Sequence, residues 1–277
     1  MKSPLTLPPE PAPDGIPSRV GAPAAIGNRS RIAELIRCWA TALYAAVVCL
    51  PMLWAARPGT PLRVLGIAVF EYLARLQGRT LGSDRRLAIA QACDLGSLRD
   101  NYYDHQRLNV AEYRSLRSQL RNAVSQPGSS YYLRQLRQAE RSRPILLAGF
   151  SGIGSAVAAY RTRVLDLMLQ WMQTISSVRV EPVKYQSILS VLCLMQLADD
   201  VLDWRDDDMA RRPSYVTAVL LDRPRSAVAA PLRAQADALL RCTVHAAQED
   251  AGAVIFAVAG AVTWAFAVVL LKVRFPQ

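Results

Sequence analysis

Histidine and closely spaced cysteine are scarce in this sequence, and each scarcity argues against a class of metal or disulfide site. The only histidines are His105 and His245, which leaves little room for a histidine-rich metal site. The five cysteines include no CxxC pair, so neither a zinc site nor a disulfide framework is indicated, and a reducing compartment is the simplest setting. Prolines, rather than the apolar core of a signal peptide, follow Lys2. These features favour a cytoplasmic protein.

Charge and hydropathy narrow the class further. Hydrophobic residues make up 52% and charged residues 20% of the 277 residues, and the mean hydropathy is +0.12. This balance excludes general disorder and argues against a protein with many membrane spans. The net charge of +11 comes almost wholly from arginine, because lysine occurs only at positions 2, 184 and 272. An anionic partner is favoured: nucleic acid, a membrane surface or a phosphorylated small molecule.

Strand patterns are lacking, whereas helical patterns run through most of the chain. Residues 1–29 are rich in proline and glycine and predict a disordered or polyproline-like tail. Residues 30–277 predict one all-α domain, a bundle or barrel of about ten helices, because apolar residues recur at steps of three and four. The expected helices cover roughly 30–56, 61–79, 83–106, 110–124, 129–142, 145–177, 184–207, 214–221, 226–248 and 251–273.

Two segments, residues 38–56 and 251–271, are apolar on all sides. The second carries no charge over 21 residues, and Lys272 and Arg274 follow it, so it is long enough to cross a bilayer. Two interpretations stay open: a buried helix at the centre of the bundle, or a membrane-associated helix. Pro51 weakens the case for the first segment as a span.

The strongest feature is a run of carboxylates at the end of an apolar helix. Asp199, Asp200 and Asp203 form a DDxxD pattern, and Asp207 follows. On one continuous helix Asp199, Asp203 and Asp207 share a face, where like charges repel and need a compensating cation. Mg²⁺ suits such oxygen ligands, with water and substrate phosphate completing its shell. The alternative is a solvated acidic helix end beside arginines.

A second pair of carboxylates, Asp100 and Asp104, also lies one turn apart late in a predicted helix. By itself this DxxxD pair is a weak signal, because most such pairs are ordinary surface charges. Two clusters about 100 residues apart, each at the end of a long helix, are more specific together. They could face each other across a cavity and hold metal ions between them.

Several basic residues lack an obvious role. Arg161 and Arg163 lie in an apolar helix, where an unpaired charge is costly, so one of them either faces the cavity or shares a solvated face. The arginines of residues 114–143 form a basic face that is solvated or meets anionic lipid. Lys184 begins the helix that ends at Asp199, ~22 Å away, so we expect no direct contact with a phosphate at that end.

The two aspartate clusters resemble those of the class I isoprenoid synthase superfamily, which includes prenyl diphosphate synthases, squalene and phytoene synthases, and class I terpene cyclases. Residues 211–217 are similar to the basic segment that follows the second motif in prenyl synthases. The resemblance implies an α-helical barrel that binds three Mg²⁺ ions, or Mn²⁺, with the substrate. The implied metal ligands are Asp100, Asp104, Asp199, Asp200, Asp203 and Asp207, all but the last also catalytic, and the implied diphosphate ligands are Arg211, Arg212 and Tyr215.

The activity that the resemblance implies is a terpene synthase reaction. A prenyl diphosphate of the farnesyl or geranylgeranyl class would ionise to an allylic carbocation, with metal and arginine neutralising the leaving group and an apolar pocket excluding water. The NDxxSxxxE-type motif of terpene cyclases is absent, however, so the subfamily stays open.

Other functions stay open beside this one. They are a prenyl-chain or squalene/phytoene-type synthase, an integral UbiA-type prenyltransferase, and a non-enzymatic membrane adaptor. Nucleic acid is not expected, because no binding motif accompanies the arginines. Peripheral membrane contact through residues 251–271 and a homodimer are both compatible with the sequence.

Overall fold

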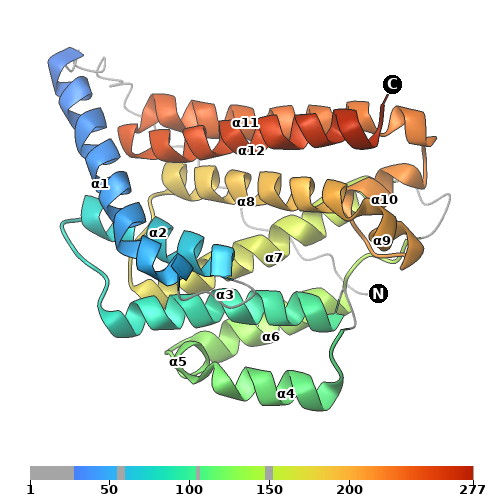
Figure 1. The fold of residues 1–277 in the computed structure, drawn as a ribbon, viewed down its shortest axis with the longest axis horizontal. Coiled ribbons are helices and arrows are strands. Elements are labelled where there is room, and N and C mark those ends of the chain that lie inside the picture. Colours follow the sequence, from blue (N-terminus) through green and yellow to red (C-terminus); the bar gives the residue numbers. More distant parts are fainter. Residues whose placement is uncertain (1–27, 55–59, 104–106, 147–151, 277) are drawn as a thin grey trace, which may run out of the picture.

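The computed structural model describes residues 28–54, 60–103, 107–146 and 152–276, which form an all-helical bundle (Figure 1). These residues contain twelve α-helices, two short 3₁₀ helices and no strand, so the all-α prediction is confirmed. The expected tail of residues 1–29 lies outside the described residues, apart from Asn28 and Arg29, which begin the first helix.

The helices follow the expected order with several changes in their ends. They are α1 (Asn28–Trp54), α2 (Thr60–Leu76), α3 (Ser83–Tyr103), α4 (Val110–Gln119), α5 (Arg121–Val124), α6 (Ser129–Arg141), α7 (Ile153–Ser176), α8 (Pro182–Leu202), α9 (Trp204–Met209), α10 (Tyr215–Leu220), η1 (Arg225–Ala227), α11 (Ala229–Glu249), η2 (Ala251–Ala253) and α12 (Val254–Arg274). The expected helix over 145–177 begins only at Ile153 in the part of the chain that the structure describes.

Helix α8 lies at the centre of the bundle because it is apolar on nearly every side. It packs against α11 and α12 on one side and against α7 on the other, and α7 in turn packs against α3 (Figure 1). Leu194, Leu197 and Val201 of α8 are fully buried. Helices α3 and α8 run in the same direction, whereas α7 runs the opposite way, so α3 and α8 end on the same side of the molecule.

The predicted helix over 184–207 is two helices in the structure. Asp203 leaves helical geometry at φ −97° and ψ 12°, and α9 begins at the next residue. Trp204 explains the change of direction, because its buried ring lies 5.2 Å from the ring of Phe275 and 4.7 Å from the guanidinium of Arg225. The prediction that Asp199, Asp203 and Asp207 share one face is therefore wrong, since Asp207 turns inward and is buried.

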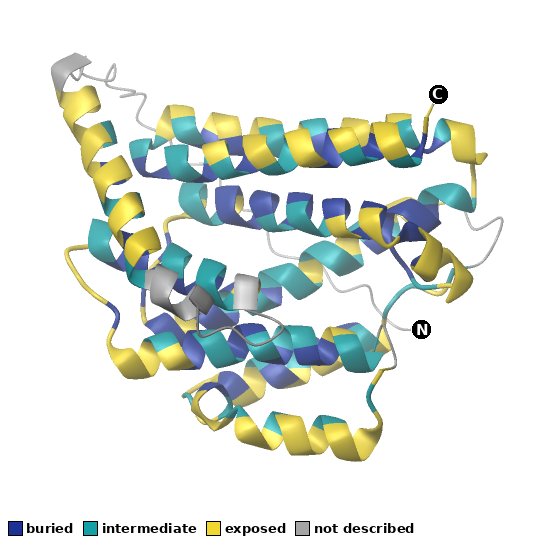
Figure 2. Ribbon diagram, viewed as in Figure 1, coloured by how far each residue is buried: buried dark blue, intermediate teal, exposed yellow. Residues whose placement is uncertain are grey.

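Helix α12 lies at the edge of the bundle. Its inner side contacts α8 and α11, but only 22% of its most apolar stretch is buried, and its outer side is exposed (Figure 2). The interpretation as a helix buried at the centre is therefore wrong. By length and composition alone, Ala251–Arg274 is the one helix in the described ranges that could cross a membrane.

Candidate functional site

The described aspartates of the two clusters lie on the same side of the bundle. Because α3 and α8 run in the same direction, Asp100 near the end of α3 and Asp199 and Asp203 at the end of α8 lie on the same side of the molecule (Figure 1). All three residues are exposed. Asp104, the other expected ligand of the first cluster, lies outside the described residues. Helix α7 packs between the two helices, so α3 and α8 share a side of the molecule without lying next to each other.

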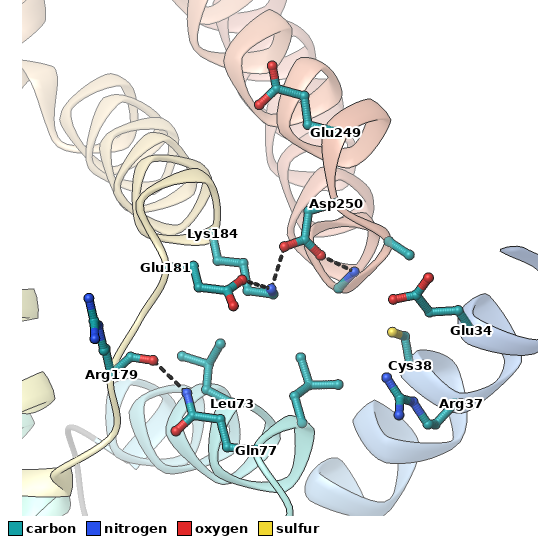
Figure 3. Close-up of a pocket in the computed structure, with 13 residues that line it drawn as sticks. Glu34, Arg37, Cys38, Leu73, Gln77, Arg179, Glu181, Lys184, Glu249 and Asp250 are labelled. Atoms are coloured by element: carbon teal, nitrogen blue, oxygen red, sulfur yellow. Dashed lines mark hydrogen bonds and ion pairs between the residues drawn. The ribbon is translucent and has the colours of Figure 1, made fainter. Parts of the chain in front are cut away.

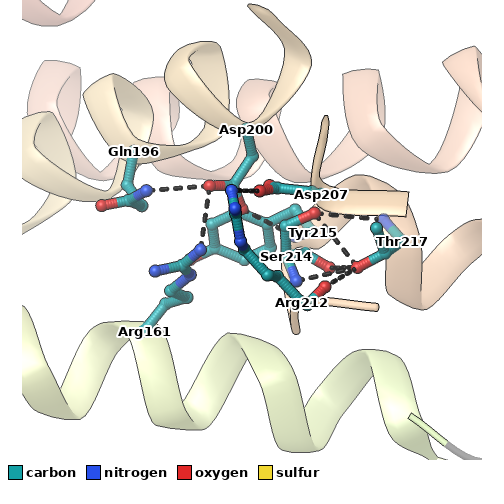
Figure 4. Close-up of polar contacts among 8 residues, drawn as sticks. All are labelled: Arg161, Gln196, Asp200, Asp207, Arg212, Ser214, Tyr215 and Thr217. Atoms are coloured by element: carbon teal, nitrogen blue, oxygen red, sulfur yellow. Dashed lines mark hydrogen bonds and ion pairs between the residues drawn. The ribbon is translucent and has the colours of Figure 1, made fainter. Parts of the chain in front are cut away.

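Asp200 differs from these residues because it is buried and points into the bundle. Its Oδ1 atom accepts hydrogen bonds from Arg161 Nη2 of α7 at 3.2 Å and from Gln196 Nε2 at 2.8 Å (Figure 4). Its Oδ2 atom accepts one from the backbone N–H of Tyr215 at 2.7 Å. Only 2% of the Asp200 side chain is exposed. Asp200 therefore joins α7, α8 and the start of α10.

Burial shifts the ionisation of Asp200. Desolvation raises the pKa of its carboxyl to about 6, and the nearby charge of Asp207 acts in the same direction. Arg161, the Tyr215 N–H and Gln196 each lower that pKa and so limit the rise. At neutral pH Asp200 is an ionised partner of Arg161, and its charge can change within a mildly acidic range.

Asp207 forms a second buried ion pair beside the first. Its Oδ1 atom lies 3.3 Å from Arg212 Nη1, and Figure 4 shows both side chains close to Asp200. Burial raises the pKa of Asp207, while Arg161 and Arg212 lower it. A capping box between Ser214 and Thr217 fixes the following loop, because the Ser214 hydroxyl accepts from the Thr217 N–H at 3.2 Å. Two carboxylates and two guanidinium groups thus balance one another in the interior.

Arg211 and Tyr215 occupy very different positions, although both were expected to bind diphosphate. Arg211 is exposed and has φ 52°, a left-handed conformation that an arginine adopts only at a cost. Tyr215 is buried at 3% exposure, and burial raises the pKa of its hydroxyl. The Tyr215 residue contributes its backbone N–H to Asp200. Arg211 is therefore the more accessible of the two for an anion.

Helix α7 links the second cluster to the first, a connection that the sequence did not reveal. Arg161 reaches Asp200, and the preceding residue Tyr160 donates its hydroxyl to Glu140 Oε2 of α6 at 2.9 Å. Glu140 Oε1 lies 3.6 Å from Nη2 of the buried Arg99, next to Asp100 on α3. The sequence indicates these contacts only weakly. Gln196 stands four residues before Asp200, which suits a contact on one helix face, but Glu140 and Tyr160 belong to helices whose packing the sequence does not specify.

Aromatic rings gather at the end of α3. The rings of Tyr102 and Tyr113 stack with centroids 4.5 Å apart, and that of Tyr103 lies 4.8 Å from Tyr102. The guanidinium of Arg99 lies 5.1 Å from the Tyr103 ring. These contacts place an apolar, electron-rich surface at the helix end that carries Asp100.

Among the described aspartates, Asp199 and Asp203 are exposed carboxylates that could hold a metal ion. Among the described residues, no group of three or more histidine, cysteine, aspartate or glutamate side chains could hold a metal ion. Asp200 and Asp207 are committed to Arg161 and Arg212. The exposed pair Asp199 and Asp203 fits Mg²⁺, which characteristically takes one or two carboxylates, retains several waters and fills its shell with phosphate oxygens.

The opposite end of α8 carries a separate polar pocket of about 360 Å³ (Figure 3). Lys184, which stands near the start of α8, forms ion pairs there with Glu181 and Asp250. The pocket is also lined by Arg37 of α1 and by Arg179. Lys184 is therefore engaged at the end of α8 opposite to Asp199.

Comparison with known proteins gives no relative for this chain. No protein-family model matches it, and neither a curated protein nor a solved structure is similar to it. The class that can be stated is therefore the one that the fold defines, an all-α bundle with two aspartate clusters at one end.

Proposed function

We propose that the protein is a Mg²⁺-dependent class I isoprenoid synthase, most simply a terpene synthase that acts on farnesyl or geranylgeranyl diphosphate. One observation carries the proposal. The parallel course of α3 and α8 brings Asp100 and the exposed pair Asp199 and Asp203 to the same end of the bundle. A diphosphate bridged to carboxylates through Mg²⁺ needs such an arrangement.

The residues of this end divide into two roles in the proposal. The exposed Asp199, Asp203 and Asp100 would hold Mg²⁺, which supplies Lewis-acid neutralisation of the diphosphate when it is bound. The exposed Arg211 would contact the diphosphate directly. Asp200 would act as a positioning residue, because its carboxylate is already bonded to Arg161, Gln196 and the Tyr215 backbone.

The proposed reaction begins with heterolysis of the allylic C–O bond. The electron pair leaves with the diphosphate oxygen, and the allylic carbon becomes a cation. Neutralising the growing negative charge on the leaving group lowers the barrier, because such electrostatic stabilisation acts most strongly where charge develops. The rings of Tyr102 and Tyr103 offer a surface of the kind that stabilises a nearby cation.

Product analysis tests the proposal and separates its variants. The protein is incubated with geranyl, farnesyl or geranylgeranyl diphosphate and Mg²⁺, and the products are identified by mass spectrometry. Hydrocarbon or alcohol products support a terpene synthase. Longer diphosphates would move the proposal to a chain-elongating synthase, and a head-to-head product to a squalene-type synthase. If all three substrates remain intact, the proposed function is wrong.

The proposed location is the cytoplasmic surface of a membrane. Prenyl diphosphates carry long apolar chains, and α12 has the length and composition of a membrane-associated segment. Fractionation of cells that express the full chain tests this location. Recovery in the membrane fraction supports it, and recovery wholly in the soluble fraction contradicts it.

A further inference from the structure

The outer side of α12 is a continuous apolar face. Its large side chains expose between 42% and 70% of their surface, and they recur at steps of three or four residues, which places them on one side of the helix (Figure 2). They are Val258, Val262, Phe266, Val269 and Val273. No charged residue occurs between Val254 and Leu271. We call these five residues the outer face of α12.

The inner side of the same helix is fixed to the bundle. A Cβ atom on Gly260 would lie 2.8 Å from Thr243 Oγ1 of α11, so the two helices approach as closely as glycine allows. Trp264 Nε1 donates a hydrogen bond to Asp237 Oδ1 of α11 at 2.6 Å, and Leu271 is 2% exposed. A helix that crossed a bilayer alone would lose these contacts. The structure therefore favours a helix that stays docked and presents one side outward.

Charge complementarity identifies what covers the outer face. The helix contains no acidic residue, its last turn carries the exposed Lys272 together with Arg274, and the whole chain has a net charge of +11. An apolar stripe with basic residues at its C-terminal end matches the hydrocarbon boundary and headgroups of an anionic bilayer. A water-exposed helical dimer would carry charged residues beside its apolar seam, whereas exposed Ala261 and Ala265 stand beside this one.

Helix α1 adds a second exposed apolar face that begins close to the start of α12. Arg31 Nη2 of α1 donates to the Gln248 carbonyl of α11 at 3.1 Å, and α1 contacts both η2 and α12. Further along α1, Ile36, Trp39 and Leu43 expose 64%, 48% and 67% of their surface. Exposed tryptophan is typical of helices that lie at a membrane–water interface.

We propose that α12 lies flat on an anionic bilayer, with its outer face in the headgroup and acyl boundary and its inner face still packed on α11 and α8. This inference rests on the membrane location proposed above but not on the proposed chemistry. The contact would be peripheral, so the protein would bind and leave the surface without unfolding. A substrate with a prenyl chain in that bilayer would be within reach of the bound enzyme.

Vesicle flotation tests the surface directly. The purified full chain is mixed with vesicles of phosphatidylcholine alone or of phosphatidylcholine with phosphatidylglycerol, and the floating fraction is measured. We expect stronger binding to the anionic vesicles and weakening by salt. Val262→Glu and Phe266→Glu should each reduce the partition coefficient about tenfold, because each puts a charge into the apolar boundary.

A matched control keeps the test specific. Val110→Glu places the same charge at a valine of α4 that is 49% exposed and far from α12 in the sequence, and it should float as the wild type does. All three variants should keep the wild-type circular dichroism and thermal midpoint, because the replaced side chains are exposed.

Three outcomes of these experiments would overturn the inference. If Val262→Glu and Phe266→Glu bind like Val110→Glu, the outer face does not contact lipid. If the membrane-bound wild type resists alkaline carbonate, α12 spans the bilayer. If the wild type sediments as a dimer that Val262→Glu dissociates, a second copy covers the face. Pyrophosphate release from soluble geranyl diphosphate is measured in parallel. A protein that does not bind membranes can then be distinguished from a protein that does not catalyse the proposed reaction.

Discussion

Arg161 Nη2 lies 3.2 Å from Asp200 Oδ1, and this buried ion pair joins α7 to the end of α8 that carries the DDxxD pattern. The Arg161 side chain is 12% exposed and that of Asp200 is 2% exposed, so neither charge can be solvated well if its partner is removed. The pair explains how a carboxylate in the middle of the DDxxD pattern is tolerated inside the bundle.

Removing one partner of this pair should destabilise the protein. Asp200→Ala removes the carboxylate that lies 3.2 Å from the largely buried Arg161, and it should lower the free energy of unfolding by about 3–5 kcal/mol. Asp200→Asn keeps the shape and an acceptor for the Tyr215 N–H, so it should cost less. Urea unfolding measures both. Equal stability of Asp200→Ala and the wild type would show that the pair does not stabilise the fold.

The ionisation of Asp200 should make stability depend on pH. Its pKa in the folded protein, about 6, is above its ordinary value of 3.8, mainly because of burial. Between these values the folded state binds more protons than the unfolded state, so the free energy of unfolding falls as pH rises from about 4 to about 6. The fall attributable to Asp200 should be on the order of 3 kcal/mol, with Asp207 acting in the same direction.

Urea unfolding across this pH range, compared between wild type and Asp200→Asn, measures the effect. The variant should show a smaller decline, because the substituted amide does not titrate. An equal or steeper decline in the variant would contradict the assignment to Asp200. Both proteins share every other carboxyl group, so the difference isolates one residue.

Arg211 offers a substitution that separates binding from stability. Its φ of 52° suits glycine, so Arg211→Gly should be neutral or stabilising by up to about 1 kcal/mol. If Arg211 contacts diphosphate, the same variant should raise KM for the prenyl diphosphate about tenfold or more. Thermal unfolding and steady-state kinetics measure the two effects.

Ser177→Gly is the control for this prediction. Ser177 has φ 53° at the end of α7, so its replacement by glycine should have the same small effect on stability. Its KM should equal that of the wild type, because Ser177 lies at the end of α7 opposite to Arg161. An unchanged KM in Arg211→Gly would exclude Arg211 from diphosphate binding.

Gly260 tests the packing of α12 on α11. Gly260→Val should destabilise the protein by about 1–3 kcal/mol, since its first added carbon would meet Thr243 Oγ1 at 2.8 Å. Gly154→Val, in α7 where an added Cβ meets no atom within 4 Å, is a comparison for the loss of a helical glycine. If both variants lose the same stability, α12 does not approach α11 closely.

The helical class and the order of the helices follow from local patterns. Apolar periodicity and proline positions define helices such as α8, whose first residue is Pro182. The direction of Asp207 does not follow from such patterns, because it depends on Trp204 packing against the distant Phe275. The partnership of Arg161 with Asp200 likewise depends on how α7 crosses α8.

The position of α12 also could not be predicted from its composition. A helix that is apolar on all sides suits both a bundle centre and a membrane surface, and the sequence carries the same residues in either case. Contacts with α8 and α11 cover only one side of α12, and such contacts join residues far apart in the chain.

The most direct test of the proposed function compares pyrophosphate release by three proteins with farnesyl and geranylgeranyl diphosphate, with and without Mg²⁺. The proteins are the wild type, Asp199→Asn/Asp203→Asn, and Asp206→Asn/Asp208→Asn, a control that removes two exposed carboxylates from neighbouring α9. We predict Mg²⁺-dependent release by the wild type and the control, and a loss of at least about a hundredfold in the first variant while its fold is retained. Equal release by the first variant and the control, or none by the wild type, would contradict the account.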